Sequence, residues 1–103
     1  MIKVCPLFSG SKGNSTYIEI NGNGVLLDAG VSFSRISQKL DAAGISPLQV
    51  KAILITHEHS DHIRGAGVAA RKLGVPVYAT IPTWYSMKKT LGKIEKNNIL
   101  PVT

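Results

Sequence analysis

The sequence predicts a layered α/β fold, built from one β-sheet and the helices that cover it. Short apolar or alternating runs bounded by Gly, Asn and Ser are typical of strands, and they recur along the chain. Between them lie segments with apolar residues at helical spacing, and strands that alternate with helices favour a layered arrangement. The length of 103 residues and the hydrophobic content of 44% suit one small domain with a core.

The first three strands are expected at Lys3–Phe8, Ser15–Ile20 and Gly24–Leu27. The segment Asn21-Gly22-Asn23-Gly24 predicts a tight hairpin turn between the second and the third strand, because Asn and Gly accept the positive φ angles that such turns require.

A helix is then expected from Phe33 to Ala43, with Ser32 or Ser34 as its N-cap and Gly44 as its stop. The later elements follow in order: a turn at Ser46-Pro47-Leu48, a buried strand at Ala52–Ile55, a helix that ends near Lys72 before Gly74, a strand at Val77–Ala79, a helix with Pro82 in its first turn, and a strand at Ile99–Val102.

All three histidines of the chain lie just beyond the buried strand, in the segment His57-Glu58-His59-Ser60-Asp61-His62. Histidines used for packing have no reason to cluster, and imidazoles beside carboxylates at the end of a strand are typical of a metal site. The ligand set contains no thiolate, which suits zinc first and manganese or iron next, and differs from a cysteine-rich structural zinc site.

The spacing within this segment predicts two metal ions rather than one. In an extended chain alternate side chains point the same way, so His57 and His59 can bind one cation together. His62 would then face away and bind nothing. A turn at Ser60 changes this, because it directs Asp61 and His62 toward a second cation, at the roughly 3.5 to 4 Å spacing of two-metal hydrolases.

A purely structural interpretation of the same residues is also open. Ser60 or Asp61 could cap a helix running from Ile63 to Leu73, with the histidines as ordinary polar residues. The two interpretations are compatible for Asp61, since a metal ligand can also cap a helix. Glu58 lies between the two ring-bearing positions and is expected to face away, without binding a metal directly.

The segment from Thr56 to His62, THEHSDH, resembles the H-x-H-x-D-H motif of the metallo-β-lactamase superfamily of dinuclear metal hydrolases. The segment Val25–Gly30 resembles that family's first motif, an apolar strand that ends in an aspartate and a glycine. The opening segment Leu7–Tyr17 resembles the hairpin of one bacterial branch, the YycJ-like or WalJ-like proteins, which are regarded as metal-dependent exonucleases. The resemblance extends from Val4 to about Thr90.

This resemblance implies the αββα sandwich of the superfamily, of which the chain would form the N-terminal half, a mixed sheet with helices on one face. Residue by residue, it implies that His57 and His59 bind the first metal. Asp61 and His62 would bind the second. It also implies that Asp28 is a buried aspartate that orients the ligand segment through hydrogen bonds.

The chain departs from the family pattern after His62. The family completes its site with a third histidine for the first metal, a bridging aspartate and a last histidine, and no histidine follows His62 here. Residues 1–103 are therefore interpreted as the truncated N-terminal part of a metallo-β-lactamase-like domain. Half a sandwich would leave a sheet face uncovered, so we expect the chain to associate with itself or with the remainder of the protein.

The charge of the chain indicates a class of substrate, and its cysteine content indicates a cellular compartment. Twelve Lys and Arg against six Asp and Glu give a formal net charge of +6, which suits a polyanionic substrate such as DNA or RNA, although the remainder of a longer protein need not be basic. Cys5 is the only cysteine, so a reducing compartment fits. No secretory signal or membrane-spanning run is visible, which predicts the cytoplasm and no membrane partner.

Three further groups of residues are candidates for substrate contact. In the loop before the second strand, glycine amides together with Ser11, Lys12 and Asn14 can form a phosphate cradle, and a plain flexible turn explains this loop equally well. Trp84 and Tyr85 could stack a base, but helix packing is the commoner role of such aromatics. A basic cluster could contact nucleic acid, although a solvated helix face is its commoner explanation; it comprises Lys88, Lys89, Lys93 and Lys96.

The expected chemistry of the complete protein is hydrolysis by a metal-bound hydroxide. Two cations lower the pKa of water to about 7 and neutralise the developing charge, and Asp61 would orient the hydroxide. A dinuclear metal nuclease or phosphodiesterase is the first expectation, and hydrolysis of a thioester, lactone or lactam is the alternative that the same motif allows. For these 103 residues alone we expect an inactive half-domain that binds metal weakly or not at all.

Overall fold

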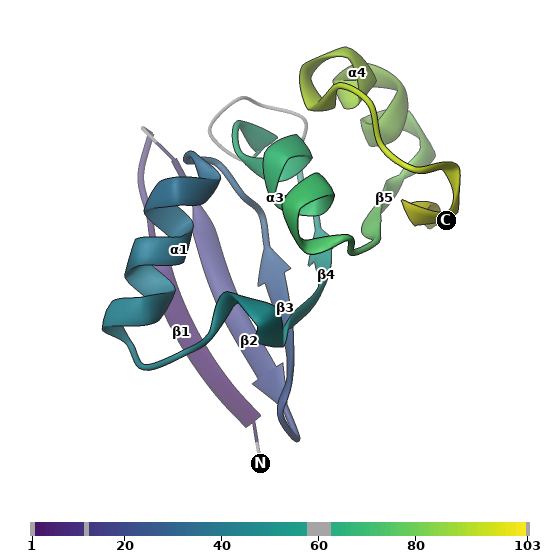
Figure 1. The fold of residues 1–103 in the computed structure, drawn as a ribbon. Helices are drawn as coiled ribbons and strands as arrows, with labels where there is room; N and C mark the ends of the chain where they lie inside the picture. The colour runs from purple at the N-terminus through teal and green to yellow at the C-terminus, as the bar shows by residue number, and fades with distance from the viewer. Residues whose placement is uncertain (1, 12, 58–62, 103) are drawn as a thin grey trace.

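The computed structural model describes residues 2–11, 13–57 and 63–102 of the chain. Within these residues six strands form one sheet, in the order in which they occur in the sequence (Figure 1). They are β1 (Ile2–Phe8), β2 (Ser15–Ile20), β3 (Asn23–Leu27), β4 (Val50–Leu54), β5 (Val77–Thr80) and β6 (Ile99–Val102). The first three strands are antiparallel neighbours, and β3 to β6 are parallel, so the sheet is mixed, as predicted.

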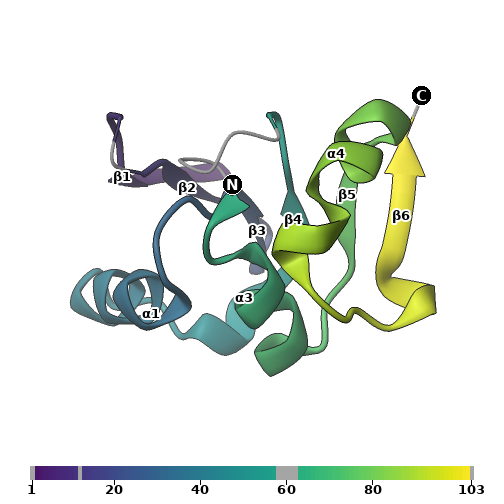
Figure 2. The same cartoon turned by 90° about the horizontal axis from the view of Figure 1, so that it is seen from above.

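Helices cover one face of this sheet. Figure 2 shows α1 (Phe33–Ala42) and α3 (Ala66–Leu73) on the same side of the strands, with α4 (Ile81–Leu91) beside α3. Two short 3₁₀ turns, η1 (Pro47–Gln49) and η2 (Lys96–Asn98), precede β4 and β6. The core lies between the helices and the sheet, where the central strands contribute the fully buried side chains of Tyr17, Leu26, Ile53 and Val77. No helix among the described residues is long and apolar enough to span a membrane.

The opposite face of the sheet is incompletely covered in the described part of the chain. The register places Leu27 beside Leu54 and Leu54 beside Tyr78, and the Leu54 side chain is 37% exposed. A cavity of about 440 Å³ lies over this face, with Val25, Ala52 and Val102 among its lining residues. This is the uncovered surface expected of half a sandwich, and self-association through it stays a prediction.

Most predicted elements are confirmed with shifts of one or two residues. Ser32 rather than Ser34 caps α1, because the Ser32 hydroxyl accepts a hydrogen bond from the Arg35 amide at 3.3 Å. The strand predicted at Ala52–Ile55 begins earlier, at Val50, since a capping box between Ser46 and Gln49 closes η1 directly before it.

The helix predicted to end near Lys72 is confirmed as α3, which begins at Ala66 with Gly65 as its N-cap. The alternative of a helix that already runs from Ile63 is not borne out, because residues 64 and 65 form a turn. The Gly65 amide donates to the carbonyl of Ala29 at 2.6 Å, and a β-carbon on Gly65 would collide with the carbonyl oxygen of Val31. Close packing against this neighbouring turn therefore fixes where α3 starts. Ser60 and Asp61, the caps considered for this helix, lie outside the described residues.

The two aromatic residues predicted for base stacking both lie in α4 but differ in their exposure. Pro82 lies in the first turn of α4, as predicted, and the Thr80 hydroxyl caps this helix by accepting from the Thr83 amide. Trp84 is only 8% exposed and belongs to the core, whereas Tyr85 is 76% exposed. Trp84 is therefore a packing residue, and only Tyr85 is accessible to a ligand.

Candidate metal centre

The histidine segment leaves the sheet at the edge where the parallel strands end. Leu27, at the end of β3, pairs with Leu54, at the end of β4, and Leu54 pairs with Tyr78 of β5. The residues that follow β3 and β4 therefore meet at one edge of the sheet. Asp28 and His57 are among them, which places them on the side of the sheet where ligands of parallel α/β sheets are usually found.

Asp28 anchors the start of the histidine segment. Its side chain is 6% exposed, and its backbone has a φ of +65°, a left-handed conformation that Asp and Asn tolerate better than most residues. The Asp28 amide donates to the carbonyl of Leu54 at 2.7 Å. Its carboxylate accepts two hydrogen bonds of 2.7 Å from Thr56, one from the amide and one from the hydroxyl. The residue directly before His57 is thus held at two points.

The Thr56 hydroxyl connects Asp28 to the imidazole of His57. The Thr56 hydroxyl lies 2.9 Å from Nδ1 of His57. A hydroxyl has one hydrogen, and here Thr56 donates it to Asp28, so the contact with His57 is satisfied when Nδ1 carries the proton. In the neutral ring Nε2 then carries the lone pair, and this is the tautomer that binds a metal through Nε2.

The predicted ligand set lies mostly outside the described residues. His59, Asp61 and His62 belong to the segment 58–62, as does Glu58, so His57 is the one predicted ligand whose surroundings the structure shows. Among the described residues, no three His, Cys, Asp or Glu side chains gather closely enough to hold a metal ion. The assignment of four ligands to two metals, and of a role for Asp28 beside them, stays a prediction.

The candidate phosphate loop packs against the turn that carries Asp28. The Gly30 amide donates to the carbonyl of Asn14 at 2.8 Å, and a β-carbon on Gly13 would collide with a methyl of Val31. The Asn14 side chain closes the loop, since its Oδ1 accepts from the Gly10 amide and its Nδ2 donates to the Gly10 carbonyl. The loop therefore lies beside the edge of the sheet that carries Asp28 and His57.

The candidate phosphate ligands of this loop differ in what the structure shows. Ser11 is exposed and Lys12 lies outside the described residues. The Asn14 side chain is occupied within the loop itself. Binding of a phosphate by the loop stays a prediction.

Sequence reasoning assigned no role to Thr56, although it stands next to the histidines. A signal was available, because Asp28 and Thr56 follow neighbouring strands whose carboxyl ends meet if those strands are parallel. A carboxylate and a hydroxyl at such positions are placed to hydrogen-bond. The tight approach of Gly65 to the Asp28 turn had no comparable signal, because it depends on how α3 docks.

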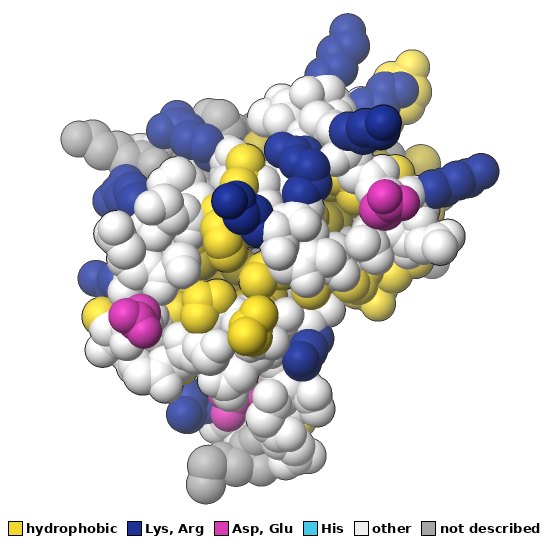
Figure 3. Space-filling model, viewed as in Figure 1, with side chains coloured by type: hydrophobic (Ala, Val, Ile, Leu, Met, Phe, Trp, Pro, Cys, Tyr) yellow, Lys and Arg dark blue, Asp and Glu magenta, His cyan; other side chains and the backbone are white. Residues whose placement is uncertain are grey.

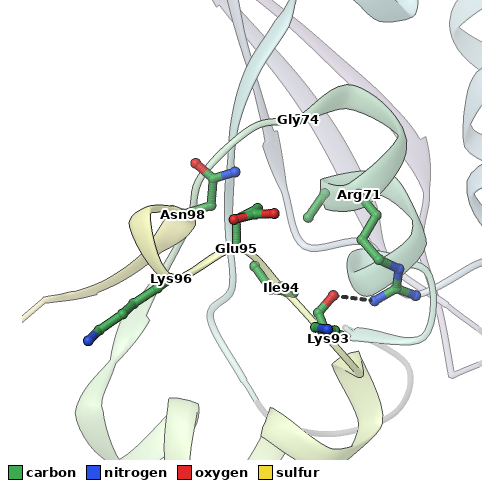
Figure 4. Close-up of a pocket in the computed structure, with 8 residues that line it drawn as sticks. Arg71, Gly74, Lys93, Ile94, Glu95, Lys96 and Asn98 are labelled. Carbon is green, nitrogen blue, oxygen red and sulfur yellow. Dashed lines mark hydrogen bonds between the residues drawn. The ribbon is translucent and has the colours of Figure 1, made fainter.

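A second cavity, of about 560 Å³, lies away from this edge, between the end of α3 and the segment that leads into β6 (Figure 4). Its charged lining consists of Arg71, Lys93, Lys96 and Glu95. The guanidinium of Arg71 donates to the carbonyls of Leu91 at 2.6 Å and Lys93 at 3.0 Å. Arg71 thus binds the end of α4 to α3 and is a structural residue of this cavity.

Comparison with known proteins identifies the family to which this chain belongs. Residues 9–101 match the model of the metallo-beta-lactamase superfamily, whose members generally bind two divalent metal ions. The exodeoxyribonuclease WalJ of Streptococcus pneumoniae is 48% identical over 93 residues, which cover 88% of this chain and 35% of that protein. The exodeoxyribonuclease YycJ of Bacillus anthracis is 44% identical over 88 residues, which cover 85% of this chain and 33% of that protein.

The fold agrees with these matches. A solved structure of a peroxy diiron species of the chemotaxis sensor ODP superposes with a TM-score of 0.76 at 22% identity, covering 98% of this chain and 40% of that chain. The chain spans about a third of the length of its curated exonuclease relatives. The predicted resemblance to the superfamily and to its exonuclease branch is confirmed, and the chain belongs to the metallo-β-lactamase superfamily.

Proposed function

We propose that the complete protein is a metal-dependent nuclease that hydrolyses phosphodiester bonds of DNA or RNA. The observation that carries the proposal is the 48% identity to an exodeoxyribonuclease over most of this chain. The formal net charge of +6 supports it, because a basic surface attracts a polyanionic substrate. A cytoplasmic location forms part of the same proposal and rests on the single cysteine, which suits a reducing compartment.

The proposed ligands of two divalent metal ions are His57 and His59 for one and Asp61 and His62 for the other. Imidazole and carboxylate suit zinc first, with manganese or iron as alternatives. The described part of the site fits such an ion, because the Asp28–Thr56 network favours the His57 tautomer with its lone pair on Nε2. When bound, the ions would lower the pKa of water and offset negative charge at the phosphate.

The chain's own residues would perform three tasks around these ions. Asp28 and Thr56 would hold the His57 ring and its proton in the orientation that metal binding requires. Asp61, besides its role as a ligand, would orient the attacking water. Backbone amides of the loop beside the Asp28 turn, with Ser11, Lys12 and Asn14, would receive a phosphate of the substrate.

The test is a substrate panel applied to the complete protein loaded with zinc or manganese. End-labelled single-stranded and duplex DNA, RNA, a thioester and a lactone are compared, with His59→Ala and His62→Ala as inactivated variants and Lys51→Ala as a surface control. We expect cleavage of nucleic acid that falls by at least about 100-fold in both histidine variants. Turnover of the thioester or lactone without cleavage of DNA or RNA would refute the proposal.

The 103-residue chain alone is proposed to be inactive, because no histidine follows His62 to complete a two-metal site. The same panel, applied to this chain, should give no turnover. Nuclease activity that disappears in the His59→Ala variant of this chain would contradict that view.

A further inference from the structure

We propose that the exposed face of α4 is a contact surface for single-stranded nucleic acid, separate from the metal centre. The face consists of Ile81, Tyr85, Lys88 and Lys89, and we call it the α4 stripe. The spacing of four, three and one residues places these side chains along one side of the helix. The inference rests on the proposed nuclease function, since it concerns how the substrate of that nuclease is held.

Tyr85 is the first reason to regard the stripe as a binding surface. Its side chain is 76% exposed, while the adjacent Trp84 is 8% exposed and fills the core, so packing explains one aromatic residue and not the other. The Lys88 ammonium lies 4.7 Å from the centre of the Tyr85 ring. The ammonium therefore lies over one face of the exposed ring, and a base that stacks on Tyr85 would have a cation next to it to neutralise its phosphate.

The charge of this part of the molecule is the second reason. The segment from residue 63 to residue 103 contains one carboxylate, Glu95, against seven basic residues: Arg64, Arg71, Lys72, Lys88, Lys89, Lys93 and Lys96. In Figure 3 Lys and Arg side chains gather over α3 and α4, at the upper right of the molecule. A helix face that is merely solvated usually carries interspersed charges of both signs, yet α4 contains no acidic residue. A polyanion is the partner that this imbalance fits.

The position of α4 is the third reason. The Ile55 amide donates to the carbonyl of Tyr78 at 2.9 Å, so the end of β5 lies next to the residues that lead into the histidine segment. The helix α4 begins directly after β5, at Ile81. Tyr85 lies four residues further, about 6 Å along the helix axis. A nucleic-acid strand bound at the edge of the sheet that carries Asp28 and His57 can therefore continue onto the α4 stripe.

The test measures binding without cleavage. A fluorescent oligothymidylate is titrated with the 103-residue chain in EDTA, and the unmodified chain is compared with Tyr85→Ala, Tyr85→Phe and the double variant Lys88→Ala/Lys89→Ala. The matched control is Lys3→Ala/Lys51→Ala, which removes the same charge from exposed positions on β1 and β4. Circular dichroism checks that every variant remains folded.

We expect Tyr85→Ala to weaken binding by about 5-fold or more, because stacking contributes about 1–3 kcal/mol per base, and Tyr85→Phe to restore it. The double variant should lower the slope of log affinity against log salt by about 1.4, since each phosphate contact contributes about 0.7 for a single strand. The control should change affinity by less than about 2-fold. Absence of binding, an unchanged Tyr85→Ala, or equal losses in the double variant and the control would each overturn the inference.

The outcome is distinguishable from failure of the proposed function. Cleavage by the complete protein with no contribution from the stripe refutes the inference and leaves the nuclease proposal standing. Binding through the stripe with no cleavage by the metal-loaded complete protein refutes the nuclease proposal and supports the stripe.

Discussion

Replacing Asp28 with asparagine reverses the polarity of the hydrogen bonds that reach His57 while preserving their geometry. Asparagine has the shape of aspartate and tolerates the φ of +65° at this position, so the backbone is not strained by the change. The carbonyl oxygen of the introduced amide can still accept from the Thr56 amide. Its NH₂ group then faces the Thr56 hydroxyl, which must accept, and the hydroxyl hydrogen turns toward Nδ1 of His57.

The consequence for the imidazole is a change of tautomer. In the unmodified chain the three contacts of 2.7, 2.7 and 2.9 Å favour a proton on Nδ1. In Asp28→Asn a donating hydroxyl favours the proton on Nε2, where a metal would bind. Recovering the binding tautomer sacrifices one hydrogen bond, at a cost of about 1–3 kcal/mol, which corresponds to about 5–150-fold weaker metal binding.

The assay is a zinc titration of the complete protein against a competing chelator. Asp41→Asn, an exposed position on α1, removes the same charge and serves as the control. Thr56→Ser keeps the hydroxyl and should bind nearly as tightly as the unmodified protein, whereas Thr56→Val should resemble Asp28→Asn. Nitrogen chemical shifts of the His57 ring report the tautomer directly. Zinc affinity within about 2-fold of the unmodified protein, or a loss equal to that of Asp41→Asn, would refute the reasoning.

Three further substitutions test the packing around the site. Gly65→Ala should lower the free energy of unfolding by about 1–3 kcal/mol, because the added β-carbon would collide with the Val31 carbonyl. Gly74→Ala should cost only about 1 kcal/mol of backbone strain, because its added carbon meets nothing within 4 Å. Chemical denaturation of both variants measures the difference. Burial raises the pKa of Tyr17 to about 12, and the 2.7 Å hydrogen bond to Glu19 and the charge of that carboxylate act in the same direction. The contribution of Tyr17 to the free energy of unfolding should therefore be constant below pH 10 and fall between pH 10 and 12. Tyr17→Phe should remove this alkaline loss in denaturation curves. Arg71→Lys should lower the melting temperature, since a single ammonium cannot reproduce the two guanidinium bonds that secure the end of α4, and an unchanged melting temperature would show that these bonds contribute nothing.

The order and type of the elements could be predicted because local patterns specify them. The Asn-Gly hairpin, the Ser32 cap and the glycine that follows α1 act within a few residues, and the structure reproduces all three. Gly74 has a φ of +65° and ends α3, as its position after the apolar pattern predicts. Such features depend on neighbours in the sequence, so one sequence suffices to identify them.

The details of the site could not be predicted in the same way, because they depend on contacts between distant segments. The motif identified His57, but the Thr56 hydroxyl acquires its role only when β3 and β4 lie side by side and bring Asp28 to it. The need for glycine at the start of α3 is of the same kind, since the clash that requires Gly65 comes from Val31. Which of Trp84 and Tyr85 is exposed depends on how α4 docks against its neighbours.

The turn at Asp28 and Ala29 forms hydrogen bonds with residues on both sides of the histidine segment. Asp28 holds Thr56 on the upstream side, and the carbonyl of its neighbour Ala29 accepts from the Gly65 amide on the downstream side at 2.6 Å. Because both bonds start from adjacent residues, the two ends of the segment are fixed relative to each other by the fold alone. Closing a loop costs conformational entropy, and fixed ends reduce what metal binding must still supply. The metal ligands proposed for this segment would therefore be partly positioned by the fold before a metal ion binds.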